Sequence, residues 1–316
     1  MKLSFLKVLI LFFIGTALGL SVIGCSSGKL GSTLVNHPPQ ENPPITIESQ
    51  AEADKTPMTA SYPERTILPE NTSASQALKE NPPENPPGIV LEKSSKTIPV
   101  LYYHSVMVEP GNELRIPPAQ FETQMRYLSE QGYNVVNLDQ LYKYFYEKGI
   151  LPEKPVVITF DDGYEDNYTN VFPILKKYGY TATVFVVTGY VNGKGFMSWK
   201  QLQELGDSGW QIEGHTLNHP SLVKDKLDVI SLKLEITEAK DILEKRFGRT
   251  VKFFAYPNGD YNSDVIRKVK EAGYLMAFTT ERGWADRKDP MLVHRVYCFA
   301  NMGIEEFARR LNNPQY

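Results

Sequence analysis

Pro155-Val-Val-Ile-Thr-Phe-Asp-Asp-Gly163 begins as an apolar, β-branched run and ends on two adjacent carboxylates. The apolar part has the length and composition of a buried strand, and Gly163 interrupts the pattern before a polar segment, 164–170, that we expect to open a helix. Functional groups collect at the carboxyl ends of strands in parallel α/β folds. Asp161 and Asp162 either form a helix cap and turn there, or share a partner such as a metal ion.

A second polar segment, His215-Thr-Leu-Asn-His-Pro220, comes directly after an apolar stretch that ends at Glu213. Histidines four residues apart can face the same way on one helical turn, but Pro220 disfavours helix at His219 and predicts a loop with a turn. Two imidazoles at one strand end and a carboxylate at another would form a site of two histidines and one carboxylate with open coordination positions. The alternative is a polar turn that arose by chance.

A third candidate is His104, which ends the apolar run from Ile98 to Tyr103. A histidine at a strand end is either a hydrogen-bonded structural residue or a group that exchanges protons near neutral pH. Its position predicts that it lies on the same rim as the double aspartate, where a hydrolase would need a proton donor.

From residue 98 onward, apolar runs of strand length alternate with amphipathic helical segments. The expected strands are 98–103, 133–136, 156–160, 181–187, 210–213, 251–255, 275–279 and 292–297. The expected helices are 118–131, 138–148, 171–178 with an interruption near Pro173, 199–208, 227–247, 263–272 and 304–311. Repeated βα units predict an α/β fold, a distorted (β/α) barrel with about seven parallel strands and helices outside.

The amino-terminal 24 residues are typical of a signal peptide. Lys2 and Lys7 precede an almost unbroken apolar core, 8–20, that is short for a membrane span. The following Val-Ile-Gly-Cys25 resembles a bacterial lipoprotein signal, which predicts acylation of Cys25 and an extracytoplasmic, membrane-anchored protein at the cell surface. An ordinary signal peptide or an uncleaved anchor is the alternative.

Residues 25–97 are expected to be the lipidated cysteine followed by a disordered tether. Eleven of the chain's 22 prolines fall there, among polar residues without a sustained apolar period. Such a composition cannot bury enough surface to offset its ordering entropy, and paired prolines extend it. The globular domain is then predicted to span 98–316. His37, inside the tether, is given no role.

Composition argues against two classes of protein, nucleic-acid-binding proteins and small disulfide-rich proteins. A formal net charge of −3 offers no basic surface for nucleic acid, and two cysteines are too few for a disulfide framework.

Taken together, Thr159-Phe-Asp-Asp-Gly163 and His215-Thr-Leu-Asn-His-Pro220 resemble the first two motifs of the polysaccharide deacetylases, carbohydrate esterase family four with its NodB-homology domain. The resemblance covers residues 98–316. It implies that Asp161 is the general base and that Asp162, His215 and His219 bind a divalent metal, zinc before cobalt or nickel. Nothing in the local sequence tells the two aspartates apart, so their roles come from the resemblance alone.

The third motif of that family, Arg-x-Pro-Tyr-Gly, is altered here to Ala255-Tyr-Pro-Asn-Gly259. The backbone N–H of Asn258 would still hold the oxyanion, and Tyr256 belongs to the same oxyanion and substrate segment. Arg295, from a neighbouring strand end, is a candidate to replace the missing arginine that orients the base.

The early Pro99-Val-Leu-Tyr-Tyr-His104 looks like the branch that deacetylates poly-β-1,6-N-acetylglucosamine, in which the barrel is permuted and the acid histidine comes from the first strand. We therefore assign the acid role to His104 and expect His294 to be structural. Candidate residues for sugar stacking are Tyr102, Tyr103, Trp199 and Trp284.

The function that the resemblance implies is metal-dependent hydrolysis of the acetamide of an N-acetylglucosamine polysaccharide at the cell surface, with an exopolysaccharide synthase as an expected partner. Two alternatives stay open. One is a deacetylase of peptidoglycan or chitin, or an acetyl esterase of xylan. The other is a non-catalytic, glycan-binding lipoprotein, because the altered third motif could mark a degenerate site.

Overall fold

The structure, a computed structural model, describes residues 97–316. The predicted signal peptide, the lipidation site Cys25 and the tether up to residue 96 lie outside the described residues. Within the described part, the first strand begins at Thr97, one residue before the predicted domain boundary.

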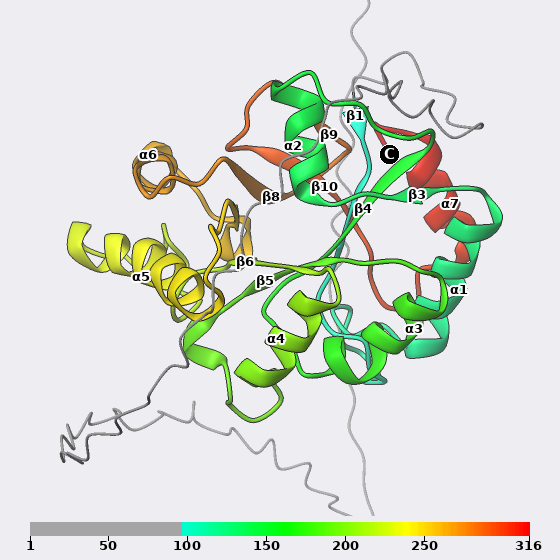
Figure 1. The fold of residues 1–316 in the computed structure, drawn as a ribbon, viewed down its shortest axis with the longest axis horizontal. Coiled ribbons are helices and arrows are strands. Elements are labelled where there is room, and N and C mark those ends of the chain that lie inside the picture. Colours follow the sequence, from blue (N-terminus) through cyan, green and yellow to red (C-terminus); the bar gives the residue numbers. More distant parts are fainter. Residues whose placement is uncertain (1–96) are drawn as a thin grey trace, which may run out of the picture. The chain divides into compact units, whose positions relative to one another are not determined.

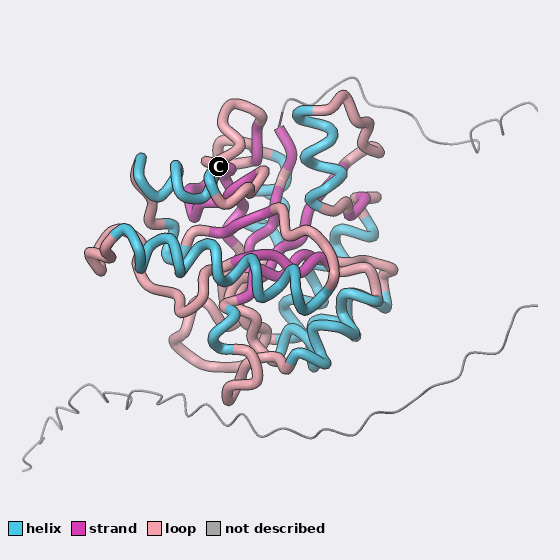
Figure 2. The backbone as a smooth tube through the Cα atoms, turned by 60° about the vertical axis from the view of Figure 1, so that its left-hand side comes forward, coloured by secondary structure: helices cyan, strands magenta, loops and turns pink. Residues whose placement is uncertain are grey.

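Seven parallel strands close into a ring in the order β2-β10-β8-β7-β6-β5-β4, and β4 pairs again with β2. Helices surround these strands on the outside (Figures 1 and 2). The ring strands are β2 (Val100–Tyr103), β4 (Pro155–Phe160), β5 (Thr183–Val186), β6 (Gln211–Gly214), β7 (Phe253–Ala255), β8 (Met276–Arg282) and β10 (Val293–Tyr297). The predicted (β/α) barrel with about seven parallel strands is therefore confirmed.

The helices are α1 (Pro118–Glu130), α2 (Leu138–Tyr146), α3 (Phe172–Lys177), α4 (Trp199–Asp207), α5 (Val229–Phe247), α6 (Ser263–Glu271) and α7 (Ile304–Asn312). Capping residues set their starts: Asn137 forms a capping box with Gln140 at α2, and the Asp228 side chain accepts from Ser231 N–H at α5. Because Asp228 is the cap, α5 starts two residues after the predicted position 227.

Alternation along the strands separates two cores. Odd-numbered residues of β4 and β7, such as Val157 and Phe253, pack in one cluster with the Leu138 and Leu141 side chains of α2. Even-numbered neighbours, such as Ile158, pack in the other cluster against the surrounding helices. Side chains of a strand alternate between its two faces, so the first cluster fills the barrel interior.

The same alternation places the candidate residues. Asp161 continues the interior series of β4, His104 that of β2 and His215 that of β6, while Arg295 lies within the interior series of β10. Four side chains that are far apart in the sequence therefore meet at the carboxyl-end mouth of one barrel.

The segment after Gly163 opens a helix, but its first turn, η1 (Asn167–Val171), is a π-helix, and α3 continues directly from it. The prediction that Pro173 interrupts this helix was wrong. The helical run passes through Pro173, which lies just after the point where the π-helical turn gives way to the α-helix.

The predicted strand 133–136 is present as β3 (Asn134–Val135), which pairs with β4 as a side strand outside the ring. The sequence showed no sign of the antiparallel pair of β1 (Thr97–Ile98) with β9 (Ala285–Asp286), because strands of two residues are too short to show a pattern of alternation.

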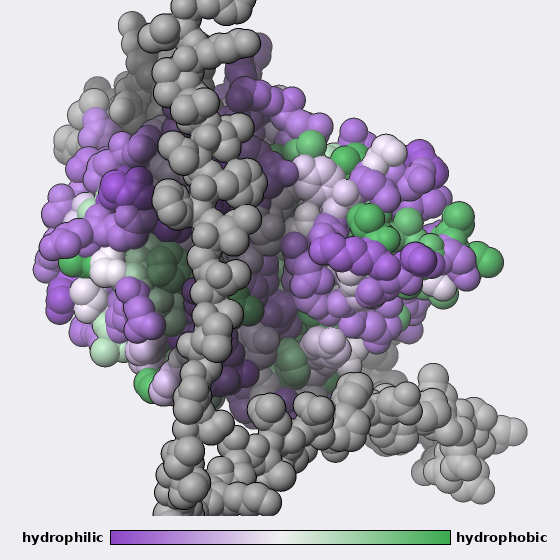
Figure 3. Space-filling view, turned by 180° about the vertical axis from the view of Figure 1, so that it is seen from behind, coloured by the Kyte–Doolittle hydropathy of each residue, from purple (hydrophilic) through white to green (hydrophobic). Residues whose placement is uncertain are grey.

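The visible part of the face shown in Figure 3 is mostly hydrophilic, with apolar side chains gathered over helix α5. The exposed apolar residues of this helix are Val229, Ile230 and Leu234. No helix among residues 97–316 is both long enough and apolar enough to cross a bilayer.

Candidate active site

Asp161 and Arg295 form a buried, bidentate ion pair at the barrel mouth. Arg295 Nη1 and Nη2 donate to Asp161 Oδ1 and Oδ2, each at 2.8 Å, and the two side chains are 0% and 2% exposed. The Arg295 Nε–H donates to the carbonyl of Thr279, which fixes the guanidinium plane. Burial alone would raise the pKa of Asp161, but the charge and hydrogen bonds of Arg295 outweigh it and hold the pKa below its usual value.

Asp162, His215 and His219 bring three ligand atoms together. Asp162 Oδ1 lies 3.3 Å from His215 Nε2 and 3.4 Å from His219 Nε2, and all three ligand atoms lie within 4.8 Å of one another. Ligand atoms around a tetrahedral ion at about 2.0–2.2 Å are separated by roughly 3.3–3.6 Å. The spacing between the carboxylate oxygen and each imidazole therefore fits a cation between them.

The donor chemistry fits as well. Asp162 Oδ1 is buried and has no hydrogen-bond partner, so neither imidazole satisfies it by donating a proton. His215 Nδ1 lies 2.7 Å from the carbonyl of Ala255, and donation to that oxygen leaves the Nε2 lone pair directed at Asp162. A divalent cation would satisfy the orphaned oxygen and both nitrogens.

Strained backbone marks the two loops that carry these ligands. Asp162, Thr216 and His219 have φ values of 73°, 67° and 58°, in the left-handed region that residues with a Cβ rarely adopt. Such conformations persist only where the surrounding structure imposes them. The prediction of a loop with a turn at His219, rather than a helix, is confirmed.

Helix α5 and the loop after β5 both contact residues 215–219, here called the histidine loop. The sequence predicted neither contact. Glu235 accepts hydrogen bonds from Leu217 N–H (3.0 Å), Asn218 N–H (2.8 Å) and Asn218 Nδ2 (2.8 Å). On the other side, a Cβ at Gly189 would lie 2.5 Å from the Leu217 carbonyl oxygen, so only glycine permits this approach.

His104 lies beside this cluster at the end of β2. Its Nε2 is 3.5 Å from the Tyr102 hydroxyl, while Nδ1 is buried without a hydrogen-bond partner. Burial lowers the pKa of His104, although the Asp161 and Asp162 charges act in the opposite direction. The Tyr102 ring also packs under Arg295, whose guanidinium carbon is 4.0 Å from the ring centroid. Tyr102 thus contacts both the acid candidate and the partner of the base candidate.

The π-helical turn η1 and the residue before it, Asp166, anchor the backbone from His104 to Val106. Asn167 Nδ2 donates to the carbonyl of His104 at 2.8 Å. Asp166 accepts from Ser105 Oγ at 2.5 Å and from Val106 N–H at 2.8 Å. The sequence carried one signal for this role, three polar residues at the start of a helix that follows the double aspartate, and we read it only as a helix opening.

The third motif forms the 3₁₀ turn η3 (Pro257–Gly259). Asn258 is exposed and left-handed, with φ 59°, and the Asp260 side chain joins this turn to the segment just after His219 by accepting from Ser221 Oγ at 2.7 Å. The Tyr256 ring, in contrast, is buried in the outer core between Phe254 and Tyr261. The Tyr256 side chain therefore packs and does not face substrate.

Three of the four aromatic candidates for sugar stacking were wrong. Tyr103 is fully buried, Trp199 packs on Phe247 of α5, and Trp284 lines a pocket with Thr97 and Lys154, which precede β2 and β4 at the opposite end of the barrel. Only Tyr102 lies beside the candidate site.

His294, the second histidine considered for the acid role, is half exposed and pairs with Glu281 at 3.0 Å. The structure therefore places it in a surface ion pair.

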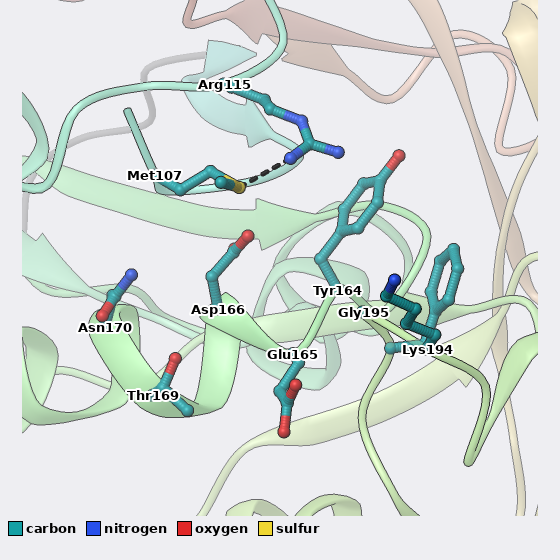
Figure 4. A pocket seen from close by; sticks show the side chains of 10 residues that line it. Met107, Arg115, Tyr164, Glu165, Asp166, Thr169, Asn170, Lys194 and Gly195 are labelled. Atoms are coloured by element: carbon teal, nitrogen blue, oxygen red, sulfur yellow. Dashed lines mark hydrogen bonds between the residues drawn. The ribbon is translucent and has the colours of Figure 1, made fainter. Parts of the chain in front are cut away.

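A pocket of about 490 Å³ opens two residues beyond Asp162 (Figure 4). Loops that follow β2, β4 and β5 line it, and its wall includes Arg115 above the Tyr164 ring, with the guanidinium carbon 5.6 Å from the ring centroid. The Tyr164 ring stacks in turn on Phe196, with centroids 5.2 Å apart. The pocket therefore lies on loops at the carboxyl ends of the strands, at the same mouth of the barrel as the cluster of aspartates and histidines.

Comparison with known proteins agrees with this geometry. Residues 148–277 match the family model described as polysaccharide deacetylase. YxkH of Bacillus subtilis (strain 168), a protein classed with the polysaccharide deacetylases, is 34% identical over 220 residues, which cover 69% of this chain and 77% of the relative. The chain belongs to the polysaccharide deacetylase family. It is accordingly a hydrolase that acts on amide bonds.

Some similar proteins have names that state a substrate, and others are named only as deacetylases. The poly-β-1,6-N-acetyl-D-glucosamine N-deacetylase of Staphylococcus aureus (strain MRSA252) is 34% identical over 193 residues, 57% of this chain and 66% of the relative. Among solved structures, the Streptococcus pyogenes deacetylase PplD in complex with acetate superposes with a TM-score of 0.64 at 28% identity, covering 68% of this chain and 98% of that one. The similarity extends over most of the barrel.

Proposed function

We propose that this polysaccharide deacetylase is a metal-dependent N-deacetylase of poly-β-1,6-N-acetylglucosamine at the cell surface. The observation that carries the proposal is the arrangement at one barrel mouth of a three-atom ligand set, Asp162, His215 and His219, next to an Asp161 held ionised by Arg295. The substrate follows from the similarity to the S. aureus deacetylase of that polymer. His104 at the end of the first ring strand supports the same choice.

Asp162, His215 and His219 would hold the cation, and two imidazoles with one carboxylate are a ligand set that suits zinc and admits cobalt or nickel. When bound, the ion supplies Lewis-acid activation of the acetamide carbonyl and of water. Nε2 of His215 is available for this role because its Nδ1 is engaged by the Ala255 carbonyl.

The remaining residues handle protons and charge. Asp161 takes a proton from the attacking water, whose oxygen bonds to the acetyl carbon, and Arg295 keeps the carboxylate oriented throughout. The backbone N–H of Asn258 would donate to the oxygen on which charge develops. His104, protonated, donates to the nitrogen as the C–N bond breaks. The products are acetate and a free glucosamine residue.

Cys25 would carry the lipid that keeps the enzyme outside the membrane, and the proline-rich segment would give the barrel reach toward a polymer extruded by a synthase. Replacing Cys25 with serine should move the protein from the membrane fraction to the medium. Because an uncleaved signal segment would also keep the variant in the membrane fraction, fatty-acid labelling decides, and a wild type labelled no more than the Cys25→Ser variant would contradict lipid anchoring.

The decisive experiment is acetate release from a panel of polymers by zinc-loaded protein. We expect release from poly-β-1,6-N-acetylglucosamine and none from Asp161→Asn protein that retains its metal. Preferential release of acetate from peptidoglycan, chitin or acetylated xylan would mean that this polymer is the substrate, and the proposed mechanism would stay unchanged. Tight oligosaccharide binding with no acetate from any polymer would identify a non-catalytic glycan-binding protein.

A further inference from the structure

The histidine loop, residues 215–219, is held by backbone contacts with the loop after β5 and by one buried carboxylate on α5. Thr188 N–H and Gly189 N–H donate to the Thr216 and Leu217 carbonyls at 3.2 and 2.8 Å. Glu235 is 9% exposed and accepts three hydrogen bonds from two consecutive residues of the loop. Oε2 receives the N–H groups of Leu217 and Asn218, and Oε1 receives the Asn218 side-chain amide. These donors lie between the two imidazoles in the sequence, so Glu235 fixes the middle of the segment whose ends approach Asp162.

The loop cannot hold this shape by itself. Thr216 and His219 both adopt left-handed backbone conformations, and within the loop the contact that closes the turn is His219 N–H donating to Thr216 Oγ1 at 3.0 Å. Left-handed residues with side chains revert to other conformations unless their neighbours prevent it. Without the Glu235 carboxylate, Leu217 N–H keeps only the Glu235 carbonyl at 3.1 Å, while Asn218 N–H loses its acceptor and would turn to water, which loosens the backbone next to His219.

His215 and His219 differ in how firmly they are held. His215 is buried, and its Nδ1 is engaged by the Ala255 carbonyl on a neighbouring strand. The His219 side chain is 24% exposed, and the contacts that place it act through the loop backbone. The position of His219 Nε2 therefore depends on the loop, and the loop depends on Glu235.

We propose that Glu235 is a positioning residue that sets the affinity of the Asp162–His215–His219 site for its cation by holding the histidine loop. It touches neither the ion nor the substrate. This inference rests on the proposed metal-dependent function and adds a determinant of metal retention, nineteen residues distant in the chain from Thr216, that no ligand motif contains.

Three substitutions separate the possible roles of Glu235. Glu235→Leu removes both side-chain acceptors, leaves the main-chain carbonyl that accepts from Leu217 N–H, and keeps a similar side-chain volume. Glu235→Asp keeps the charge but shortens the side chain by one methylene. Glu235→Gln keeps one oxygen that can accept from the two backbone N–H groups. The new glutamine NH₂ group can donate to the Asn218 side-chain oxygen once the Asn218 amide has flipped. Glu238→Leu, at an exposed position on the same helix, is the matched control.

The measurement is the dissociation constant for Zn²⁺, obtained by competition with a chromogenic chelator on full-length, metal-free protein, together with the thermal midpoint of that metal-free protein. We expect Glu235→Leu to bind zinc about 10- to 100-fold more weakly, as for other partners of metal ligands, and Glu235→Asp to be weakened less. Glu235→Gln should remain close to the wild type, and Glu238→Leu should match it.

An unchanged zinc constant in folded Glu235→Leu would overturn the proposal, even with a lowered thermal midpoint, because that pattern marks a purely structural residue. If Glu235→Leu does not fold, Glu235→Asp decides in the same way. Failure of the wild type itself to bind zinc would contradict the proposed function instead, which keeps the two failures distinguishable.

Discussion

Arg295 and Asp161 face each other across β2, with one guanidinium nitrogen 2.8 Å from each carboxylate oxygen and neither group open to solvent. The two residues come from β10 and β4, the ring neighbours of the first strand. Their pairing supplies, from a different strand, the arginine–base contact that the altered third motif lacks. The suggestion from sequence that Arg295 could orient Asp161 thus has the geometry it requires.

Arg295→Ala should destabilise the protein and shift its pH profile. Removing one partner leaves a buried charge uncompensated, which costs about 3–5 kcal/mol of unfolding free energy. The pKa of Asp161 is now held low, so losing the arginine raises it, and a base that works only when ionised loses activity from the acid side. We expect the acid limb of kcat/KM to move to higher pH, measured as acetate release, and the denaturant midpoint to fall.

Arg309→Ala is the control for arginine removal, because Arg309 is about half exposed and pairs only with Glu306 among the described residues. It should change stability by less than about 1 kcal/mol. An acid limb that stays in place in Arg295→Ala would contradict the ion pair's effect on Asp161.

His104→Gln should lower kcat by roughly 10²- to 10⁴-fold while zinc content stays stoichiometric, because a positioned proton donor contributes about that factor. Steady-state kinetics with metal analysis on the same sample measures both quantities. His294→Gln is the matched variant, and its surface ion pair predicts near-normal turnover. The reverse result, a loss at His294 and none at His104, would move the acid role to the later histidine.

Removal of the metal should abolish activity and lower stability together. Dialysis against a chelator is expected to stop acetate release, and zinc should restore it. Free zinc at 100-fold above its dissociation constant should raise the unfolding free energy by about 2.7 kcal/mol, visible as a higher thermal midpoint. Asp162→Ala should lose both responses, whereas Glu281→Ala, an exposed carboxylate elsewhere, should keep them. Full activity of metal-free protein would rule out the proposed mechanism.

Because of Glu213, the unfolding free energy should decrease as the pH rises from weakly acidic to weakly basic values. Burial raises the pKa of this interior carboxyl from 4.5 to about 8, although N–H donation from Phe253 and Lys252 opposes the shift. A carboxyl whose pKa is higher in the folded state stabilises below the unfolded pKa and loses that contribution as pH rises through the folded value.

Glu213→Gln keeps an oxygen for both N–H groups and carries no titrating proton. The variant should therefore match the wild type near pH 4.5 and exceed it in unfolding free energy above pH 8, measured by denaturant titration at each pH. Glu130→Gln, an exposed position at the end of α1, should follow the wild type throughout. Parallel pH curves for Glu213→Gln and wild type would show that Glu213 is already ionised in the fold.

The sequence was sufficient to predict the ring of strands and the polar residues at its mouth, because both predictions depend on local patterns. Alternation in runs such as 155–160 specifies strands, and polar residues directly after them must lie at strand ends. The separation of Asp161 from Asp162 needed coordinates: the left-handed φ of Asp162 turns consecutive side chains in different directions, one to Arg295 and one to the imidazoles.

Contacts between distant segments could not be read in advance. In the sequence, Glu235 resembles any polar residue of an amphipathic helix, and only the structure shows that it accepts from Asn218 N–H. Asp166 resembles a residue that starts a helix, and only the structure shows that it accepts from Val106 N–H. Tyr103 and Trp284 were misjudged for a related reason. An aromatic residue near a strand end gives no sign of which side of the wall, or which mouth of the barrel, it will face.

The position of β2 between β4 and β10 has a consequence for biogenesis. The first strand of the barrel has no second neighbour until β10, the last ring strand in chain order, has been made. His104, Asp161 and Arg295 therefore come into register only after that strand has joined the ring. A chain that stops before β10 would already carry Asp162, His215 and His219 and would still lack the guanidinium that orients Asp161.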